Sequence, residues 1–411
     1  MRSIIPFFLL ILSFVSAYPG QIEVCKGCEV QTIQQAVERA QDGDQILVRK
    51  GVYKEYDITI SKSLHFLGEK GAVIDGENKG TILSIRANNF SLKGLTIVNV
   101  GQSYTKDFAG ILIHGSDDFE LEDNDLENVF FGILVEKSGN GRIHNNRVSS
   151  QAVSQASSGN GIHLWHCANM TISSNIVQGL RDGIYFEFVK NSKVFQNKSH
   201  DNLRYGLHFM FSNHNAYHDN VFRENGAGVA IMFSKFVEMH RNKFLHNWGS
   251  ASYGLLLKEI YDANIEDNLF EQNTIGISVD GSTRIDYRNN DFLRNGWAVK
   301  IIGACYDNVF SQNNFLNNAL DLSYNSKINS NSFDRNYWSE YAGYDLDRDG
   351  IGDVPYRPVK LFSYIVHNTP ETIILLRSLF VDIINFSEKV SPVFTPDNLL
   401  DNNPLMRRAD G

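Results

Sequence analysis

The sequence predicts an all-β protein: a right-handed parallel β-helix of about 22 residues per coil, with a capping helix before it and a helical extension after it. A motif of asparagine, any residue and an apolar residue recurs at spacings of 22, 29, 22, 23, 22, 26, 22 and 23 residues. Each repeat also contains a short strand with alternating apolar positions, and proline is rare, at 8 of 411 residues. Because strands this short bury a face only when coils stack, the pattern indicates a solenoid.

The recurring asparagines are expected to lie at one corner of each coil, where an amide side chain can bond to turn backbone and stack in a ladder. They are Asn124, Asn146, Asn175, Asn197, Asn220, Asn242, Asn268, Asn290 and Asn313. The matching strand starts are Gly110, Gly132, Gly161, Gly183, Gly206, Gly228, Gly254, Gly276 and Ala298. A leucine-rich repeat is the alternative solenoid, but its Leu-x-x-Leu-x-Leu pattern is missing.

Aligning the repeats on these strand starts separates the two faces of one sheet. The first and third following positions are apolar in every repeat, from Ile111 and Ile113 to Val299 and Ile301, so they must face inward. The second and fourth positions must then face outward. The second column is Leu112, Leu134, His163, Tyr185, His208, Ala230, Leu256, Ser278 and Lys300. The fourth column is His114, Glu136, Trp165, Glu187, Met210, Met232, Lys258, Asp280 and Ile302.

Two repeats are longer than the rest. They insert residues 149–160 and 247–253 between the asparagine corner and the following strand start. Both insertions should therefore emerge on the same side of the solenoid, where loops often frame a working face.

The chain divides into four predicted segments. Residues 1–17 have a positive Arg2, an apolar run and a small-residue exit at Ala17, which is typical of a cleaved secretory signal. Residues 18–335 form the solenoid, residues 336–366 form an acidic loop and the solenoid end, and residues 367–411 form a helix and tail for partner docking. Loss of Arg2 leaves 37 basic against 47 acidic residues, a balance of −10. Without a basic stripe, the sequence does not favour nucleic-acid binding.

The solenoid needs a cap at each end. In "TIQQAVERAQDGDQILV", Ile33, Ala36, Val37 and Ala40 fall on one helical face, which predicts an N-terminal capping helix. This stretch resembles the entry into pectin-lyase-like β-helices. Near the other end, "TPETIILLRSLFVDIINFSEKV" predicts a helix that begins at Thr369 as N-cap. It is apolar almost all round, so it is either buried under the solenoid end or docked on a partner.

The outward face carries soft donors that could bind copper. Neighbouring coils lie about 4.8 Å apart, so Met210 should lie beside Met232, with His208 one step along the strand. Thioether and imidazole together suit Cu(I). The alternative is that these methionines pack under a loop or at a protein interface. His163 and His166, in "GIHLWHC", are further candidates for the copper site.

The four cysteines are too few for a disulfide-stapled scaffold. Cys167 and Cys305 are six coils apart, about 29 Å by coil spacing, so they cannot pair and are expected to be buried and single. Cys25 and Cys28, in "CKGC", are expected to form a local disulfide in an oxidising compartment.

The stretch "DLDRDGIGD" predicts a structural Ca²⁺ site. Asp345, Asp347 and Asp349 match positions 1, 3 and 5 of a calcium loop, with Gly350 at position 6 and Asp353 at position 9. Position 12 lacks the usual glutamate. A solvated acidic turn is the alternative.

The sequence also resembles the NosD family, the periplasmic β-helix proteins of nitrous oxide reductase maturation. The matching stretches are "DGIYFEFV", "RYGLHFMFS", "GAGVAIMFS", "NWGSASYGLLLKEI", "NGWAVKI", "NYWSEYAGYDLDRDGIGDVPYRPVKLF" and "LMRRADG". The resemblance implies a periplasmic, non-catalytic protein that supplies Cu(I) to nitrous oxide reductase together with an ABC transporter and a copper-carrying lipoprotein. ATPase activity would belong to the transporter, and the C-terminal helix would dock on the transporter. The ligands His208, Met210 and Met232 come from coil geometry, not from the family.

A second class of function stays open: a secreted β-helix that binds or modifies polysaccharide, with Trp165 and Tyr185 as sugar platforms. Such enzymes need a compact set of outward carboxylates. Glu187 and Lys258 should lie three coils apart, about 14 Å, and Lys258 beside Asp280 suits a simple ion pair. The sequence therefore favours a protein that is not an enzyme.

Overall fold

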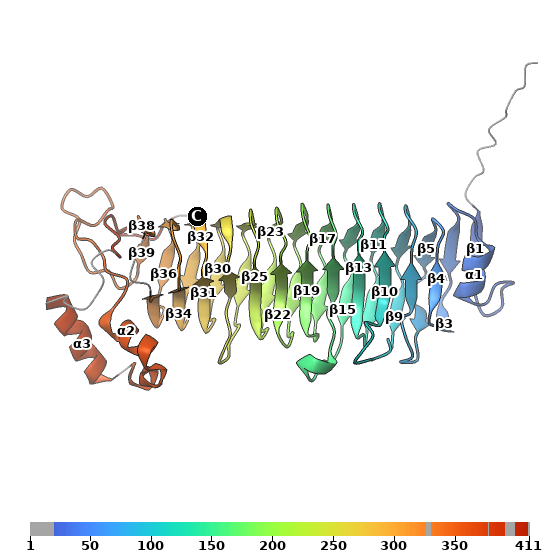
Figure 1. Cartoon of the computed structure of the whole chain (residues 1–411), viewed down its shortest axis with the longest axis horizontal. Helices are drawn as coiled ribbons and strands as arrows, with labels where there is room; N and C mark the ends of the chain where they lie inside the picture. Colours follow the sequence, from blue (N-terminus) through green and yellow to red (C-terminus); the bar gives the residue numbers. More distant parts are fainter. Residues whose placement is uncertain (1–19, 326–329, 377, 391–398, 410–411) are drawn as a thin grey trace, which may run out of the picture.

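The computed structural model describes residues 20–325, 330–376, 378–390 and 399–409. It is an elongated solenoid with a short helix at its N-terminal end and a helical pair at the other (Figure 1). The predicted signal at residues 1–17 lies outside the described residues.

Three parallel sheets form the walls of the solenoid, and consecutive strands of the chain pass from one sheet to the next. Sheet 1 contains β1 (Gln21–Val24), β2 (Gln45–Val48), β5 (His65–Gly68), β8 (Ser91–Lys93), β11 (Glu120–Glu122), β14 (Arg142–His144), β17 (Thr171–Ser173), β20 (Lys193–Phe195), β23 (Ala216–His218), β26 (Glu238–His240), β29 (Tyr261–Glu266), β32 (Thr283–Arg288), β35 (Val309–Ser311) and β38 (Ser332–Asp334). Sheet 2 contains β3 (Gly51–Lys54), β6 (Ala72–Asp75), β9 (Thr96–Val98), β12 (Asp125–Glu127), β15 (Arg147–Ser149), β18 (Ile176–Gln178), β21 (Lys198–His200), β24 (Val221–Arg223), β27 (Lys243–Leu245), β30 (Leu269–Glu271), β33 (Asp291–Leu293), β36 (Asn314–Leu316) and β39 (Tyr337–Trp338). Sheet 3 contains β4 (Ile58–Ile60), β7 (Leu83–Ile85), β10 (Ala109–His114), β13 (Phe131–Glu136), β16 (Ile162–Trp165), β19 (Asp182–Glu187), β22 (Tyr205–Met210), β25 (Ala227–Met232), β28 (Leu255–Lys258), β31 (Ile275–Asp280), β34 (Trp297–Ile302) and β37 (Leu320–Tyr324).

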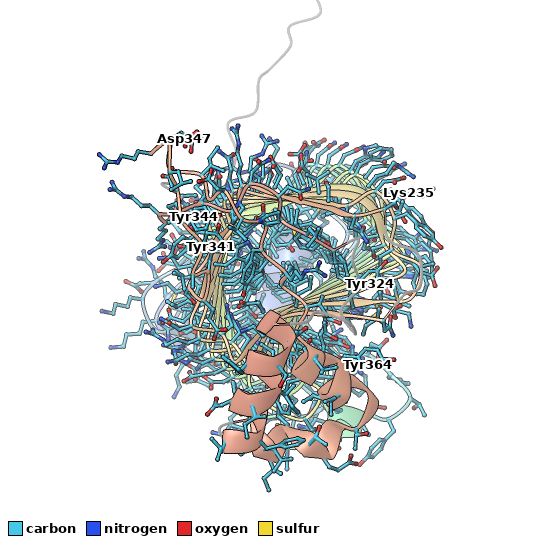
Figure 2. All side chains as sticks on the ribbon, turned by 90° about the vertical axis from the view of Figure 1, so that its left-hand side faces the viewer. Lys235, Tyr324, Tyr341, Tyr344, Asp347 and Tyr364 are labelled. Carbon is cyan, nitrogen blue, oxygen red and sulfur yellow. A yellow bond between two sulfur atoms is a disulfide. The ribbon has the colours of Figure 1, made fainter. Side chains whose placement is uncertain are left out.

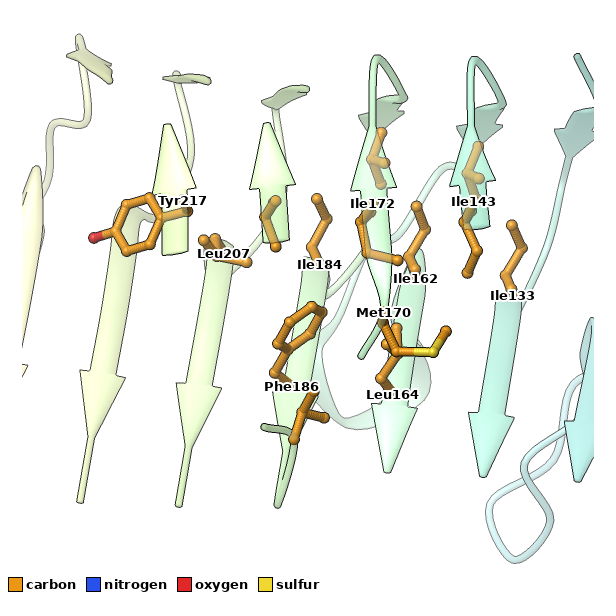
Figure 3. Packing of buried hydrophobic residues seen from close by; sticks show 14 of the residues in the cluster. Ile133, Ile143, Ile162, Leu164, Met170, Ile172, Ile184, Phe186, Leu207 and Tyr217 are labelled. Atoms are coloured by element: carbon orange, nitrogen blue, oxygen red, sulfur yellow. The ribbon is translucent and has the colours of Figure 1, made fainter. Parts of the chain in front are cut away.

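The core runs along the solenoid axis, as the alternating pattern predicts. In sheet 3 the inward columns are buried, and Ile133, Ile162, Ile184 and Leu207 line up on successive strands (Figure 3). Farther along, rings on successive sheet-2 strands stack on one another: the centroids of Phe244 and Phe270 are 4.5 Å apart, with an interplanar angle of 2°. Every strand therefore buries one face against the other two sheets, which none could do alone.

The predicted asparagine ladder is confirmed. Each amide oxygen accepts from the backbone N–H and the side-chain amide of the preceding ladder residue, for example Asn220 Oδ1 from Asn197 at 2.9 and 3.0 Å. Each amide nitrogen also donates to a backbone carbonyl, as Asn220 does to Val194 at 2.9 Å. The side chains are buried, so the ladder satisfies turn backbone that water does not reach.

A second ladder lies at the corner that precedes sheet 3. It runs through Asn202, Asn225, Asn247, Asn273, Asn295 and Asn318. The side-chain amide of each donates to the next, except that Asn225 donates to Asn247 through its backbone N–H. Asn318 then donates to Asp321 at 3.3 Å. Burial raises the pKa of Asp321 to about 6. The ladder was not predicted, because its asparagines do not precede the apolar motif that marked the first one.

The N-terminal cap has the predicted form. Helix α1 (Ile33–Arg39) buries Ile33, Ala36 and Val37 against the first coil, and the Thr32 hydroxyl accepts from the Gln35 N–H at 3.2 Å. The Glu55 carboxylate accepts from the N–H groups of Ile33 and Gln34 at 2.7 and 3.0 Å. These contacts satisfy the free donors of the first turn.

The C-terminal helix differs from the prediction. Instead of one helix from Thr369, the chain forms α2 (Leu361–Asn368), the 3₁₀ helix η2 (Pro370–Leu375) and α3 (Leu379–Val390). Helix α2 begins before the predicted boundary at residue 367, and the proline ends it, because proline has no N–H and restricts the residue before it. No helix in the described residues is both long and apolar enough to cross a membrane.

A small separate core attaches these helices to the solenoid. Phe362, Val366 and Val381 pack on the outward side of the last sheet-3 strands. The solenoid residues of this core are Ile275, Trp297 and Leu320. One face of the helices is thus buried on the solenoid. The sequence had left open whether this segment is buried under the solenoid end or docked on a partner, and the structure shows burial for this face.

The tail was predicted to serve partner docking, and its described part closes the solenoid. Asp401 is fully buried and accepts from the Asn336 N–H, the Asn336 side-chain amide and the Trp338 indole, each at 3.0 Å. Farther along, Arg408 pairs with Asp291, and the Ala409 N–H donates to Asn314 at 2.9 Å. The tail thus supplies the last acceptor of the ladder, and partner docking by residues 367–411 stays a prediction.

Candidate metal-binding face

The candidate metal-binding face is the outward side of sheet 3 between β16 and β28. The strand register places Met210 beside Met232, and Met232 beside Lys258. Tyr185 pairs with His208, and Glu187 pairs with Met210. The adjacency of the two methionines is therefore as predicted from the repeat.

The structure encloses His208 more than the alternation implies. Its residue surface is 5% exposed, although its side chain lies on the outward face. The Tyr185 ring stacks on it at 4.7 Å between centroids, and the Tyr205 ring lies 4.9 Å away, tilted by 52°. Both ring nitrogens are buried, and no hydrogen bond from the described residues engages them. A buried nitrogen without such a bond is costly, and it often marks a functional position.

Behind His208 lies a buried ion pair that the sequence analysis missed. Asp182 is fully buried, accepts from Arg204 Nε at 2.7 Å, and pairs with the second Arg204 nitrogen as well. His208 Nδ1 lies 3.6 Å from Asp182 Oδ2. Burial acts to raise the pKa of Asp182, but the hydrogen bonds from Arg204 and the proximity of His208 outweigh burial and hold that pKa below its usual value. The carboxylate is therefore ionised and can orient His208.

The repeat contains a sequence feature that could have identified Asp182 as a candidate site residue. Asp182 occupies the position before the strand-starting glycine, where the neighbouring coils have Asn160 and Tyr205. A carboxylate in an otherwise uncharged column that faces the insertion loops needs a partner. The pairing with Arg204 follows only from the coil stacking.

His163 is also held in a neutral state. Its ring lies between Phe131 and Tyr185, at 5.7 and 4.6 Å, and its Nδ1 lies 3.4 Å from the Asn160 amide nitrogen. Burial, together with the charge of Arg181, lowers the pKa of His163 to about 3. Its Nε2 is buried without a hydrogen-bond partner in the described residues. Tyr185 separates His163 from His208.

His166 lies elsewhere, at the corner after the strand. It is exposed, has a left-handed backbone with φ 53°, and stacks on Phe188 at 4.6 Å. The structure therefore does not bring His166 to His208 and Met210, as a single copper site with all five predicted residues would require.

Met210 and Met232 are the accessible soft donors. Both side chains are partly exposed, and the Tyr185 hydroxyl lies 3.7 Å from the Met210 sulfur. Two thioethers at the surface, with an imidazole beneath them, match the ligand types that select Cu(I). A metal that used His208 as well would need Tyr205 or Met210 to move, because both His208 nitrogens are enclosed.

The face offers no open sugar platform at Tyr185. His163 and His208 cover the two faces of its ring, at 4.6 and 4.7 Å, so that part of the polysaccharide alternative was wrong. At Trp165, the Lys137 ammonium lies 5.3 Å from the ring centroid. Lys258 pairs in register with Asp280, as predicted.

The predicted calcium loop gathers three of its four carboxylates. Oxygens of Asp345, Asp347 and Asp349 lie within 4.8 Å of one another. The Asp345 carboxylate also accepts from the Gly350 N–H at 3.0 Å, and Asp353 accepts from the Leu346 N–H at 2.7 Å. The neighbouring charge of Asp349 raises the pKa of Asp347. Asp347 projects from the side of the solenoid opposite the helices (Figure 2).

The cysteines have two distinct states. Cys25 and Cys28 form a disulfide just before the capping helix. Cys167 and Cys305 are free and buried, as expected for single cysteines. Burial raises the pKa of Cys167 to about 11, so this thiol is protonated and is a poor metal ligand at neutral pH.

The fold defines the class of protein: a pectin-lyase-like parallel β-helix. It is similar to a family 28 exopolygalacturonase from Yersinia enterocolitica, with a TM-score of 0.56 and 12% identity, covering 78% of this chain and 79% of that chain. It is also similar to a polygalacturonase from Erwinia carotovora ssp. carotovora, with a TM-score of 0.52 and 12% identity, covering 76% and 97%. At such identities the likeness shows the fold alone.

Comparison of sequences gives more specific relatives than comparison of folds does. Residues 148–343 match a family described as "Periplasmic copper-binding protein (NosD)". A "Probable ABC transporter binding protein NosD" from Pseudomonas aeruginosa is 27% identical over 370 residues, covering 85% of this chain and 86% of that relative. A relative of the same name from Stutzerimonas stutzeri is 27% identical over 369 residues, covering 85% and 84%. The predicted resemblance is confirmed: the chain is similar to proteins named NosD over 85% of its length.

Proposed function

We propose that this chain is a periplasmic, non-catalytic accessory protein that receives and delivers Cu(I) for the copper sites of nitrous oxide reductase. The matching family is described as periplasmic and copper-binding, and the curated relatives are named as ABC transporter binding proteins. The observation that carries the proposal is the pair Met210 and Met232, which lies in register on an outward face above His208. Copper is the cargo here.

The residues of the face have separable roles in this proposal. Met210 and Met232 present their sulfur atoms to the metal, because they are the partly exposed donors. Asp182, fixed by Arg204, faces Nδ1 of His208 and would leave Nε2 for the metal. His163 stays neutral beneath Tyr185 and supports the ring stack rather than the metal.

The partners are an ABC transporter, a copper-carrying lipoprotein and nitrous oxide reductase. The helical end of the molecule supports the transporter contact. Its outer side exposes an apolar set, namely Ile373, Ile374, Leu375, Leu379, Phe380, Ile383 and Phe386. An exposed apolar set of this size on adjoining helical segments favours a protein interface. ATP hydrolysis belongs to the transporter.

The copper site is tested by an anaerobic Cu(I) titration of the mature chain against a chromophoric chelator. We expect about one equivalent to bind, and the double variant M210L/M232L to bind at least about 100-fold more weakly. Even outer-shell changes at metal sites cost about 10- to 100-fold, and this variant removes two donors while it keeps side-chain volume.

Met406 provides the matched control for this titration, because it is a partly exposed methionine on the tail. M406L should bind Cu(I) as the wild type does. If M210L/M232L also binds as the wild type does, the proposed site is wrong. If the wild type does not bind Cu(I), the proposed function is wrong.

We also propose that the acidic loop binds a structural Ca²⁺ through Asp345, Asp347, Asp349 and Asp353. Its downstream end is tied to the tail, since Tyr356 and Asp401 exchange two backbone hydrogen bonds of 2.9 and 3.0 Å. Ca²⁺ at 100 times its Kd should stabilise the fold by about 2.7 kcal/mol. Thermal denaturation with Ca²⁺ and with chelator measures this effect. D347N/D349N should lose it, and an equal Tm in both conditions would contradict the site.

A further inference from the structure

The paired cysteines at the N-terminal end have no role in the function proposed above. Cys25 and Cys28 follow β1, in the turn that leads to α1, and are joined by a disulfide. Because β1 is the first strand of sheet 1, the pair lies at the end of the solenoid opposite the C-terminal helices (Figure 1). Both cysteines are partly exposed, and Lys26 and Gly27 between them are exposed. Solutes can therefore reach the pair.

The turn has interactions besides the disulfide that hold its shape. The Cys25 N–H donates to the Val30 carbonyl at 3.2 Å, and the Cys28 N–H donates to the Cys25 carbonyl at 3.1 Å. The Tyr53 hydroxyl also donates to the Val24 carbonyl at 2.9 Å. A disulfide stabilises a protein more when it closes a longer loop, and this one joins cysteines only 3 residues apart. We therefore expect the turn to keep its shape after reduction.

A third donor lies beside the two sulfur atoms. A carboxylate oxygen of Glu23 and the sulfur atoms of Cys25 and Cys28 all lie within 4.8 Å of one another. Arg49 Nε donates to Glu23 Oε1 at 2.6 Å, which orients the carboxylate. Hydrogen bonds of this kind to a ligating carboxylate are usual around protein metal sites. Exchange of disulfides needs only the two sulfur atoms, whereas a metal ion uses an additional donor.

The composition of the group indicates a divalent cation that binds sulfur. Two thiolates and the Glu23 carboxylate carry three negative charges, and the Arg49 guanidinium balances one of them. The two charges that remain equal the charge of a divalent ion. Zn²⁺ accepts cysteine sulfur and glutamate oxygen in one tetrahedral site, whereas Cu(I) prefers soft ligands alone. The exposed turn leaves the fourth position to water.

We propose that Glu23, Cys25 and Cys28 form a Zn²⁺ site that exists only when the disulfide is reduced. A dithiol supplies the two electrons. One of its thiolates attacks a disulfide sulfur, the S–S bond breaks, and its second thiol closes the disulfide of the oxidised reductant. Cys25 and Cys28 are left as thiols. Zn²⁺ then forms two Zn–S bonds and one Zn–O bond without a change in oxidation state, and the two thiol protons pass to solvent.

This inference does not depend on the proposed function. Met210 and Met232 lie on β22 and β25 in the middle of the solenoid, far from β1 (Figure 1). The two free cysteines are buried, so they do not compete for the metal. The acidic loop at residues 345–353 contains no cysteine, and any Zn²⁺ that it binds should be the same in both redox states.

The test compares the mature chain in two states: oxidised, and reduced with dithiothreitol that is then removed without oxygen. Thiol titration in denaturant confirms each state. Zn²⁺ affinity is measured by competition with a chromophoric chelator, and Co²⁺ in place of Zn²⁺ reports sulfur ligation through thiolate-to-metal absorption. The variants are C25S/C28S and E23Q. The matched control is E29Q, because Glu29 also adjoins the pair but bonds to Arg39, at 2.7 Å.

We expect the reduced chain to bind one Zn²⁺ at least about 100-fold more tightly than the oxidised chain, since even outer-shell changes cost about 10- to 100-fold. C25S/C28S should bind as the oxidised chain does and should lack the thiolate absorption. E23Q should bind at least about tenfold more weakly than the wild type. E29Q and M210L/M232L should bind Zn²⁺ as the wild type does.

Equal Zn²⁺ affinity in the two states of the wild type would overturn the inference, and this comparison needs no variant to fold. Wild-type affinity in reduced E23Q would overturn the assignment of Glu23 as a ligand. Binding of Cu(I) but not Zn²⁺ by the reduced pair would overturn the choice of metal. Loss of Cu(I) binding at Met210 and Met232 would instead reject the proposed function, and the difference between the redox states would still decide on the Zn²⁺ site.

Discussion

Replacing Asn220 with alanine is expected to lower the free energy of unfolding by about 4 kcal/mol, because four buried hydrogen bonds are lost at about 1 kcal/mol each and the Asn197 N–H is left without its acceptor. The Asn220 oxygen accepts two bonds from Asn197, and its amide nitrogen donates to Val194 and Asn242, at 2.9 to 3.0 Å. The side chain is fully buried. Water therefore has no access to the orphaned groups unless the coils separate.

The effect should concentrate near the candidate face. Asn220 lies in the chain between Met210 and Met232, and its ladder bonds join the coils of those two methionines. In a solenoid each coil is stabilised by its neighbours, so one weak interface can open locally. Amide hydrogen exchange should thus show faster exchange in β22 to β27 than in β10 to β15.

Asn213 is the matched control for this variant. Its side chain accepts from the Lys235 N–H at 2.8 Å, at a partly exposed position of the same coil. Water can replace that bond, so N213A should cost about 1 kcal/mol or less. Equal losses for N213A and N220A in chemical denaturation would show that the ladder does not hold the coils together.

The fold could be predicted because the same sequence pattern recurs from coil to coil. One register fixed by Asn124 to Asn313 and the following strand starts determines which residues face inward on every coil. The adjacency of Met210 and Met232 followed from the same register. A period near 22 residues does not, however, show how far an outward side chain is covered by its neighbours.

For that reason, the burial and pairing of side chains at the candidate site could not be predicted from the sequence. His208 and Met210 are equivalent in an alternating pattern, yet His208 is buried between tyrosines while Met210 is partly exposed. The pairing of Asp182 with Arg204 joins two coils through side chains of different columns. Non-repeating contacts of this kind carry no periodic signal.

The helix predicted near the C-terminal end differed from the structure for a related reason. Pro370 was interpreted as the first residue of a helix, but it also ends the helix before it, and only packing on Trp297 and Leu320 decides where α2 lies. The tail has no repeat motif at all. Its role follows from Asp401, which occupies the place of the next ladder asparagine.

Replacing Asp401 with alanine should therefore unfold the C-terminal cap, at a cost of about 3–6 kcal/mol, since three buried donors of Asn336 and Trp338 lose their acceptor. An aspartate suits this position better than an asparagine. It accepts through both oxygens, with Oδ1 bound by the Asn403 N–H at 3.2 Å, and it needs no further coil to receive a donated bond. D401N should lie between wild type and D401A.

The pH dependence of the cap gives an independent check. Burial raises the pKa of Asp401 above its usual 3.8, even though Trp338 and Asn336 donate to it. Between the unfolded and folded pKa values the folded state holds more protons, so stability falls as pH rises through that window. D401A should remove this dependence. N402A, at the exposed neighbouring position, should keep both the stability and the pH slope of the wild type.

Hydrogen exchange of the D401A variant can distinguish the role of the tail from that of the C-terminal helices. If Asp401 only anchors the tail, D401A should release the contact of Arg408 with Asp291 and leave the helices on Trp297 in place. Hydrogen exchange would then increase in β38 and β39 but not in α2. Increased exchange in α2 as well would instead show that the cap and the C-terminal helices form one cooperative unit. In that case the ladder would couple the solenoid to its helical end.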